Sequence, residues 1–198
     1  MIPHFCPHCS FANQENVMWC LQCKKIIPIT ADNFFITLNL PQQFELDVQQ
    51  LENNFFAQLR QTHPDKFINQ EKSAIEIALQ NSFIINQAYK QLKSPYARLE
   101  HLLKIAGFDI DQQVEITDLA FLEETFVWRE SLAEAKTVVE LSNLIAEIKK
   151  VEEEEFNKAA RLIAEKLYSQ ALQVYIKLKF LKRFLAEAQL REDDYEAL

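Results

Sequence analysis

Glycine is almost absent from this 198-residue chain, in which Gly107 is the only one. Phosphate-cradling loops, tight hairpin turns and barrel corners depend on the positive φ that glycine adopts readily, so a P-loop or a dinucleotide-binding fold is disfavoured. Basic residues are also few, because 21 Lys and Arg face 29 Asp and Glu and give a formal net charge of -8. That balance disfavours nucleic acid and anionic lipid as partners, apart from what a local basic patch could bind.

Long apolar runs are missing as well. No stretch of about 18 apolar residues occurs, so no membrane-spanning helix is expected. The N-terminus, "MIPHFCPHCS", lacks the basic region and apolar core of a secretory signal and the arginine-rich helix of a transit peptide. Since 48% of the residues are hydrophobic, which is ample for a buried core, we expect a soluble globular protein.

All the cysteines lie in the first 23 residues, with the spacing C-x2-C-x10-C-x2-C. Two such turns can direct four thiolates to one point, which is the usual arrangement of a structural zinc site. Two disulfides are the first alternative, disfavoured by the lack of a secretory signal, and bound iron is the second. The predicted ligands are Cys6, Cys9, Cys20 and Cys23.

Four thiolates leave no open coordination position for a substrate, so the metal is expected to be structural rather than catalytic. We predict a metal-binding knuckle over residues 1–27, folded by its metal because so short a segment cannot bury a core. His4 and His8 are close enough to be spare ligands, but solvated histidines are the simpler interpretation. Lys24 and Lys25 are the only basic residues nearby, which favours a structural or protein-facing role over nucleic-acid binding.

The next part of the chain predicts two antiparallel helices. Asp47 is a good N-cap for a first helix, which must end before Pro64 because a proline disfavours the α conformation of the residue before it. A second helix ends at "KSP", and a shorter one, "YARLEHLLKIAG", ends at Gly107. The apolar stripe of the first helix is Val48, Leu51, Phe55 and Leu59, with Phe56 adding width; that of the second is Ala74, Ile77, Ala78, Phe83 or Ile84, Ala88 and Leu92.

The C-terminal part predicts a helical bundle. The segment "FDIDQQVEIT" lacks periodicity and is interpreted as a linker, residues 108–117. Three helical segments follow it, Asp118–Lys136, Val139–Leu167 and Ser169–Leu190. The acidic run Glu152–Glu155 is expected to be a solvated face.

The first and last of these segments carry more apolar residues than a core needs. In the first, a core stripe of Phe121, Trp128, Leu132 and Ala135 is accompanied by a second stripe of Leu119, Leu122, Phe126 and Ala133, turned by roughly 140°. In the last, Phe180 is predicted to point away from the core stripe, among Lys177, Lys179 and Arg183; that stripe is Val174, Leu178, Leu181, Leu185 and Ala188. The surplus predicts a contact surface, and the alternative is packing against another domain.

The tripeptide His63-Pro64-Asp65 lies between the two antiparallel helices. A general acid-base pair is one interpretation, but no second histidine, serine or glycine loop lies nearby to build a catalytic site. A turn whose aspartate caps the following helix is another. A third is a docking element, since a rigid loop that displays these groups beside Lys66 loses little entropy on binding.

A wider pattern surrounds this tripeptide. Its elements are the "LPQQF" entry, the "HPDKF" loop, "INQAY", the "SP" break and "LLKIAGF". In order and spacing they resemble the J-domain of the HscB family of iron-sulfur co-chaperones. Downstream, "DLAFLEETFVWRESLAEA" and "KLKFLKRFL" resemble the C-terminal bundle of the family. The tetracysteine segment resembles the one found in eukaryotic members.

The resemblance implies an all-α, L-shaped co-chaperone that is not an enzyme, with a J-domain at 33–107 and a three-helix scaffold-binding bundle at 118–192. It implies two partners, a DnaK/HscA-type chaperone whose ATP hydrolysis is stimulated and the iron-sulfur scaffold protein IscU, with no nucleic acid and no membrane. The implied chaperone-docking residues are Arg60, His63, Pro64, Asp65 and Lys66, and the implied scaffold contacts are Leu122, Phe126 and Phe180. The expected location is cytoplasmic if Met1 is the native start, or the mitochondrial matrix if a transit peptide was removed.

One departure from the family concerns charge. J-domains normally present several basic residues on the first long helix, whereas residues 47–62 offer only Arg60, with Lys66 and Lys72 beyond it, so electrostatic steering should be weak. A general J-protein with another client, an acid-base enzyme and a nucleic-acid adaptor are the alternative functions.

Overall fold

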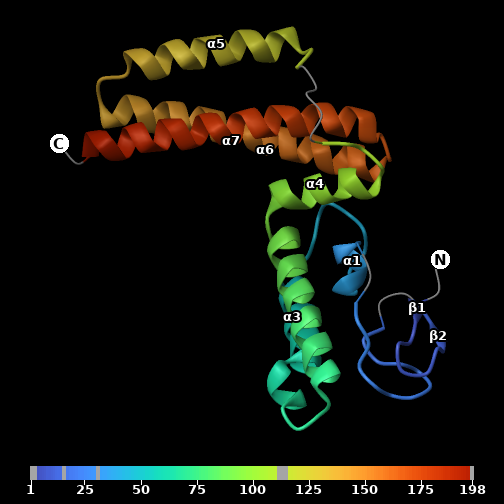
Figure 1. Cartoon of the computed structure of the whole chain (residues 1–198). Helices are drawn as coiled ribbons and strands as arrows, with labels where there is room; N and C mark the ends of the chain where they lie inside the picture. The colour runs from blue at the N-terminus through green and yellow to red at the C-terminus, as the bar shows by residue number, and fades with distance from the viewer. Residues whose placement is uncertain (1–3, 15–16, 30–31, 111–115, 197–198) are drawn as a thin grey trace. The chain divides into compact units, whose positions relative to one another are not determined.

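The computed structural model describes residues 4–14, 17–29, 32–110 and 116–196. The chain forms two compact units, Met1–Arg98 and Leu99–Leu198, and the division falls inside helix α4 (Pro95–Ile105). The first unit holds the cysteine-rich segment and a helical hairpin, and the second holds three long helices (Figure 1). Apart from two strands of two residues each, the named elements are helical, which confirms the all-α prediction.

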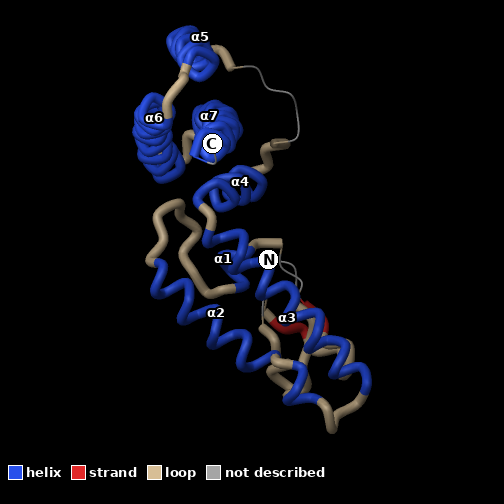
Figure 2. Tube along the Cα trace, turned by 90° about the vertical axis from the view of Figure 1, so that its left-hand side faces the viewer, coloured by secondary structure: helices blue, strands red, loops and turns tan. Residues whose placement is uncertain are grey.

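The helical hairpin of the first unit is built from α2 and α3, which lie side by side (Figure 2). Asp47 caps α2 as predicted, because its side chain accepts hydrogen bonds from the backbone N–H groups of Gln49 and Gln50. The helix ends where predicted, with His63 in an extended conformation before the proline. A short helix in the segment before the hairpin was not predicted. The bounds are α1 (Phe34–Thr37), α2 (Val48–Thr62), the 3-10 turn η1 (Pro64–Phe67) and α3 (Lys72–Lys93).

The core stripes of the hairpin correct the sequence-based ones. Phe83 is 67% exposed and Ile84 is half-buried, whereas Ile85 is fully buried in their place. The reason is the helical period, since residue 85 lies seven positions, or close to two turns, after Ala78. On α2, Val48 and Phe56 are exposed instead of buried. Polar side chains that the stripes omitted are buried in the hairpin, namely Gln58, Thr62 and Asn81.

Gly107 ends α4 as predicted. Its φ is +88°, and the backbone N–H groups of Gly107 and Phe108 donate to the carbonyl oxygens of Lys104 and Leu103 at 2.9 and 3.0 Å. Such bonds satisfy the last carbonyls of a helix and favour a glycine. The only glycine of the chain therefore lies where the end of a helix requires a positive φ.

The second unit contains the three predicted long helices, which run alongside one another in Figure 1. A capping box starts the middle helix, because Thr137 and Glu140 each bond the backbone of the other. On the last helix the core stripe contains Phe184, which is 2% exposed, while the predicted Leu185 is half-buried. The bounds are α5 (Leu119–Glu134), α6 (Val138–Ala164) and α7 (Tyr168–Glu196). None of the helices in the described part of the chain combines the length and the apolar character of a membrane span.

Candidate functional sites

The four cysteines meet at one point. Their sulfur atoms all lie within 4.8 Å of one another, with 3.7 Å between Cys6 and Cys23 and 3.6 Å between Cys9 and Cys20. A tetrahedral zinc ion with Zn–S bonds of about 2.3 Å needs sulfur atoms about 3.8 Å apart. All four are free thiols rather than disulfides. The residues present therefore fit a four-thiolate metal site, as predicted.

Two similar turns carry these ligands. In the first, the backbone N–H of Ser10 donates to the carbonyl of Cys6, and in the second that of Lys24 donates to the carbonyl of Cys20. Ser10 and Lys24 have φ values of 57° and 59°. Strands β1 (His4–Phe5) and β2 (Ala12–Asn13) pair on either side of the first turn. These local bonds fix the direction in which each pair of sulfurs points.

Hydrogen bonds to sulfur favour the thiolate that a metal requires. The backbone N–H of His8 donates to Cys6 Sγ at 3.4 Å, and Asn13 Nδ2 donates to Cys20 Sγ at 3.7 Å. His8 itself directs its Nε2 to the carbonyl oxygen of Ile26 at 3.2 Å. The cluster of possible ligands contains cysteines alone, so neither His4 nor His8 joins it among the described residues.

The thiols of Cys9 and Cys20 have pKa values shifted in opposite directions. Burial raises the pKa of Cys20, but hydrogen bonds from the backbone of Cys23 and Gln22 and from the side chains of Cys9 and Asn13 together outweigh it and lower the pKa to about 6. The backbone N–H of Phe11 favours the thiolate of Cys9, yet burial and the other three thiols raise its pKa to about 12. Metal binding at this site would therefore release protons.

The His63-Pro64-Asp65 loop is exposed and held from both sides. The imidazole of His63 and the carboxylate of Asp65 are 52% and 78% exposed, and His63 Nδ1 accepts from the backbone N–H of Asp65 at 3.4 Å. Before the loop, Ser82 Oγ donates to the carbonyl of Thr62 at 2.9 Å, which ties the end of α2 to α3. After it, Phe67 is 1% exposed and anchors η1 in the core. The loop is thus anchored at both ends and displays its polar groups to solvent.

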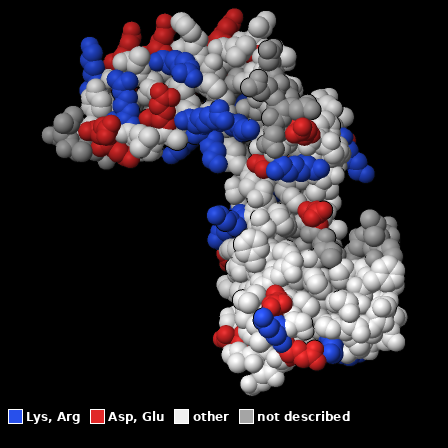
Figure 3. All heavy atoms as spheres, viewed as in Figure 1, with Lys and Arg blue, Asp and Glu red and all other residues white. Residues whose placement is uncertain are grey.

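A shallow apolar hollow of about 330 Å³ adjoins this loop. Phe56, which is 52% exposed, faces it, and the full lining is Phe56, Leu59, Arg60, His63, Asp65 and Lys66. Arg60 is the only basic residue of α2, and few charged side chains cover this unit on the face shown in Figure 3. An apolar floor with charged side chains at its rim suits contact with another protein.

The second apolar stripe of α5 is exposed, as the surplus in the sequence predicted. Leu122 and Phe126 are 41% and 63% exposed, and Leu119 is 74% exposed. Val127 is also 56% exposed, but it lies about 100° around the helix from Phe126 and belongs to neither stripe. The core stripe, by contrast, is buried throughout; it is Phe121, Trp128, Leu132 and Ala135. One helix thus packs on the bundle with one face and presents an apolar face outward.

Phe180 corrects the sequence-based picture. It is half-buried rather than directed away from the core, with its ring centroid 5.8 Å from that of Phe121 and 6.1 Å from that of Phe184. The guanidinium of Arg129 lies 5.6 Å from the ring centroid of Phe180. Phe180 therefore packs against α5 and remains only partly accessible to solvent.

A buried charge cluster at the start of α5 was missed. Lys177 is 6% exposed, and its ammonium forms ion pairs with Asp118, the N-cap of α5, and with Glu155 at 3.3 Å. Glu155 was expected on a solvated face, but only 13% of its side chain is exposed. The hydrogen bond and charge of Lys177 hold the pKa of Asp118 below its usual range. No local pattern reveals this cluster, because its three charged residues belong to α5, α6 and α7.

Comparisons with known proteins agree with this geometry. The family model described as "HSCB C-terminal oligomerisation domain" matches residues 117–189. The crystal structure of the human co-chaperone protein HscB superposes with a TM-score of 0.83 at 22% identity, covering 96% of this chain and 98% of that chain. The chaperone HscB from Vibrio cholerae gives a TM-score of 0.69 at 30% identity, covering 82% of this chain and 99% of that chain.

The match to the Vibrio protein extends over nearly the whole of that relative, and the family model covers the bundle that carries the exposed apolar stripe. The loop after α2, the hairpin that displays it and the bundle therefore occur together in one chain, as in those proteins. The chain belongs to the HscB family of J-domain co-chaperones of iron-sulfur cluster assembly.

Proposed function

We propose that this protein binds an IscU-type iron-sulfur scaffold protein through its bundle and stimulates ATP hydrolysis by a DnaK/HscA-type chaperone through its J-domain. The observation that supports the proposal best is the combination of two exposed, preorganised surfaces on two separate compact units. One protein can then hold a client and contact the chaperone that acts on it. The hydrolysis takes place in the chaperone, so this chain needs no catalytic residues of its own.

The chaperone-docking surface is assigned to the loop and the hollow beside it. His63 and Asp65 are exposed, Pro64 fixes the backbone between them, and Arg60 and Lys66 flank the apolar floor. Because Ser82 and the buried Phe67 hold the loop at both ends, its side chains lose little entropy when they dock. His63→Gln should abolish stimulation and leave scaffold binding intact.

The scaffold-binding surface is assigned to Leu122 and Phe126, with the accessible part of Phe180 at its edge. Two exposed apolar residues one turn apart on a helix form the type of anchor that a partner's groove receives. Phe180 also has a packing role, so its replacement affects both stability and binding. Leu122 and Phe126 are therefore the clean test of this assignment.

The metal is assigned as zinc. Zinc prefers four thiolates in structural sites, and when bound to Cys6, Cys9, Cys20 and Cys23 it would supply folding free energy to the knuckle. Elemental analysis of the purified protein distinguishes zinc from iron, and an iron-to-protein ratio near one without zinc would contradict the assignment.

Steady-state ATP hydrolysis by a purified DnaK-type chaperone tests the proposal. The protein should stimulate hydrolysis, and the scaffold protein should increase that stimulation synergistically. Stimulation that the scaffold protein leaves unchanged would instead indicate a J-protein with another client.

A further inference from the structure

The metal-binding knuckle and the chaperone-docking loop share a core. Phe67 lies two residues after Asp65 and is 1% exposed, and the residues that bury it include Ile26 from the knuckle together with Ala74 and Ala78 from α3. Trp19, also from the knuckle, stacks on it, with ring centroids 5.9 Å apart and planes inclined by 22°. The residue that anchors the loop is therefore covered by the cysteine-rich segment.

Trp19 and Ile26 belong to the hairpin whose tip carries two of the metal ligands. They form an antiparallel bridge, and on its tip side the backbone N–H of Cys20 donates to the carbonyl of Lys25 at 2.9 Å. On the other side, the backbone N–H of Ile27 donates to the carbonyl of Met18 at 3.0 Å. A metal bound at the tip would close this hairpin, and the hairpin sets the positions of Trp19 and Ile26.

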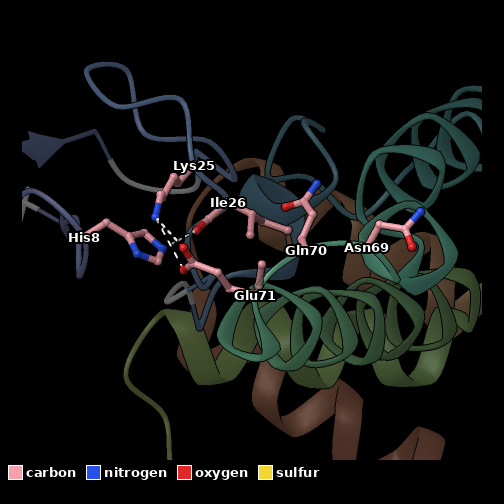
Figure 4. Close-up of a pocket in the computed structure, with 7 residues that line it drawn as sticks. His8, Lys25, Ile26, Asn69, Gln70 and Glu71 are labelled. Atoms are coloured by element: carbon pink, nitrogen blue, oxygen red, sulfur yellow. Dashed lines mark hydrogen bonds and ion pairs between the residues drawn. The ribbon is translucent and has the colours of Figure 1, made fainter.

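Two further contacts hold the hairpin against α3. Asn81 is fully buried, and its side-chain amide donates to the carbonyl of Ile27 at 2.9 Å and accepts from the backbone N–H of Ile29 at 2.8 Å. Lys25 forms an ion pair with Glu71 at 3.4 Å, as Figure 4 shows. Because the segment after the cysteines is bonded at both a carbonyl and an N–H to one buried amide, its position on α3 is fixed.

The rim of this contact is a hollow of about 310 Å³. In Figure 4 the ring of His8 is directed at the backbone of Ile26, and Glu71 lies nearby beside Lys25. Asn69 and Gln70, which follow the docking loop, also line it. The knuckle therefore lies along the chain from η1 to the start of α3.

From these contacts we infer that the metal-loaded knuckle is a buttress for the docking loop, with Trp19 and Ile26 as positioning residues. Metal binding stabilises the hairpin, the hairpin covers Phe67, and Phe67 keeps η1 in the conformation that displays His63 and Asp65. The capacity to dock a chaperone then depends on the metal at a site that does not itself touch the chaperone. The expected effect on the chaperone's ATP hydrolysis rests on the proposed function, whereas the expected effect on the order of the docking loop does not.

Hydrogen exchange of the full-length, zinc-loaded protein tests the inference. The reporters are the amides of Asp65, Lys66 and Gln70, which bond within the loop. Ile26→Ser retains all four cysteines but removes the apolar cover, and it should speed exchange at these amides on the order of tenfold. The matched control is Leu21→Ser on the same hairpin, where the side chain is 52% exposed and the exchange should stay unchanged.

Zinc removal by a chelator should speed exchange at the same three amides and leave the amides of α5 to α7 unchanged. Zinc content is measured for every variant, and if Ile26→Ser loses its metal, Trp19→Leu replaces it in the comparison. Loop exchange that stays slow both in the metal-loaded variant and after zinc removal would overturn the inference.

A chaperone assay separates this inference from the proposed function. Ile26→Ser should reduce stimulation of ATP hydrolysis, and Leu21→Ser should not. If His63→Gln stimulates as well as the wild type, the docking function is wrong, but the exchange result still decides whether the knuckle orders the loop. If stimulation depends on His63 and stays the same in Ile26→Ser and after zinc removal, the buttress is wrong and the docking function stands.

Discussion

Phe126 allows a direct test of the scaffold-binding surface, since it is 63% exposed and packs little within the bundle. A phenylalanine side chain buries roughly 200 Å² when fully covered, so about 125 Å² is available to a partner, equivalent to about 3 kcal/mol. Incomplete burial and the area that alanine retains reduce this to about 2 kcal/mol for Phe126→Ala, or about 30-fold in Kd. Leu122, at 41% exposure, should contribute about 1 kcal/mol.

Isothermal titration of the scaffold protein into each variant measures this effect, and urea unfolding measures stability alongside it. Phe126→Ala should change the free energy of unfolding by less than about 0.5 kcal/mol, because the side chain is exposed. Phe83→Ala is the matched control, since this phenylalanine is 67% exposed but lies on α3. An unchanged Kd for Phe126→Ala, or an equal loss for Phe83→Ala, would contradict the assignment.

Three further predictions concern charge, salt and pH. Lys177→Met should lower the free energy of unfolding by about 3 kcal/mol, because Glu155 stays buried without its cation. Urea titrations followed by tryptophan fluorescence measure this; adding Glu155→Leu should restore much of the loss, and wild-type stability in the single variant would contradict the argument. Stimulation of the chaperone should fall less than about tenfold between about 50 and 200 mM salt, because Arg60 is the only cation of α2, and a loss of about 100-fold would contradict this. Burial, with a smaller effect of Lys104, lowers the pKa of His101 to about 4. The unfolded chain therefore binds the extra proton, and the free energy of unfolding should fall by up to about 3 kcal/mol as the pH drops from about 6.5 to 4. In urea titrations His101→Gln should remove this pH dependence, and an equal dependence in both proteins would refute the prediction.

Local rules predicted the helix ends well. The caps and breaks at Asp47, Pro64 and Gly107 depend on a few consecutive residues, and the structure confirms each of them. The cysteine cluster was predictable for the same reason, because two short turns direct the sulfurs. The exposed α5 stripe also followed from periodicity alone. A helix that packs on one side needs only one apolar face, so the second face was expected to be a contact surface.

Local patterns did not predict burial that depends on contacts between residues far apart in the sequence. Lys177 is buried because Asp118 and Glu155 approach it from other helices, and the sequence around Lys177 does not indicate these partners. Asn81 is a similar case, since the backbone groups that its buried amide bonds belong to the distant segment after the cysteines. Phe180 was placed outside the core because its angle on α7 was considered without the ring of Phe121 on α5, which packs against it.

The roles of the predicted site residues stay predictions, and their positions define how to test them. His63 and Asp65 lie together on one rigid loop, and Leu122 and Phe126 lie together on one exposed face. These two surfaces belong to different compact units, so variants of one should leave the other functional. That independence makes a single assay informative about both.

The most direct test is steady-state ATP hydrolysis by a DnaK-type chaperone from the same source, with wild type, His63→Gln and Leu122→Ala/Phe126→Ala, each with and without the scaffold protein. The account predicts synergistic stimulation by wild type, none by His63→Gln, and loss of the scaffold-dependent part alone in the double variant. Stimulation by His63→Gln equal to that of wild type, or a double variant that keeps the full synergy, would contradict it.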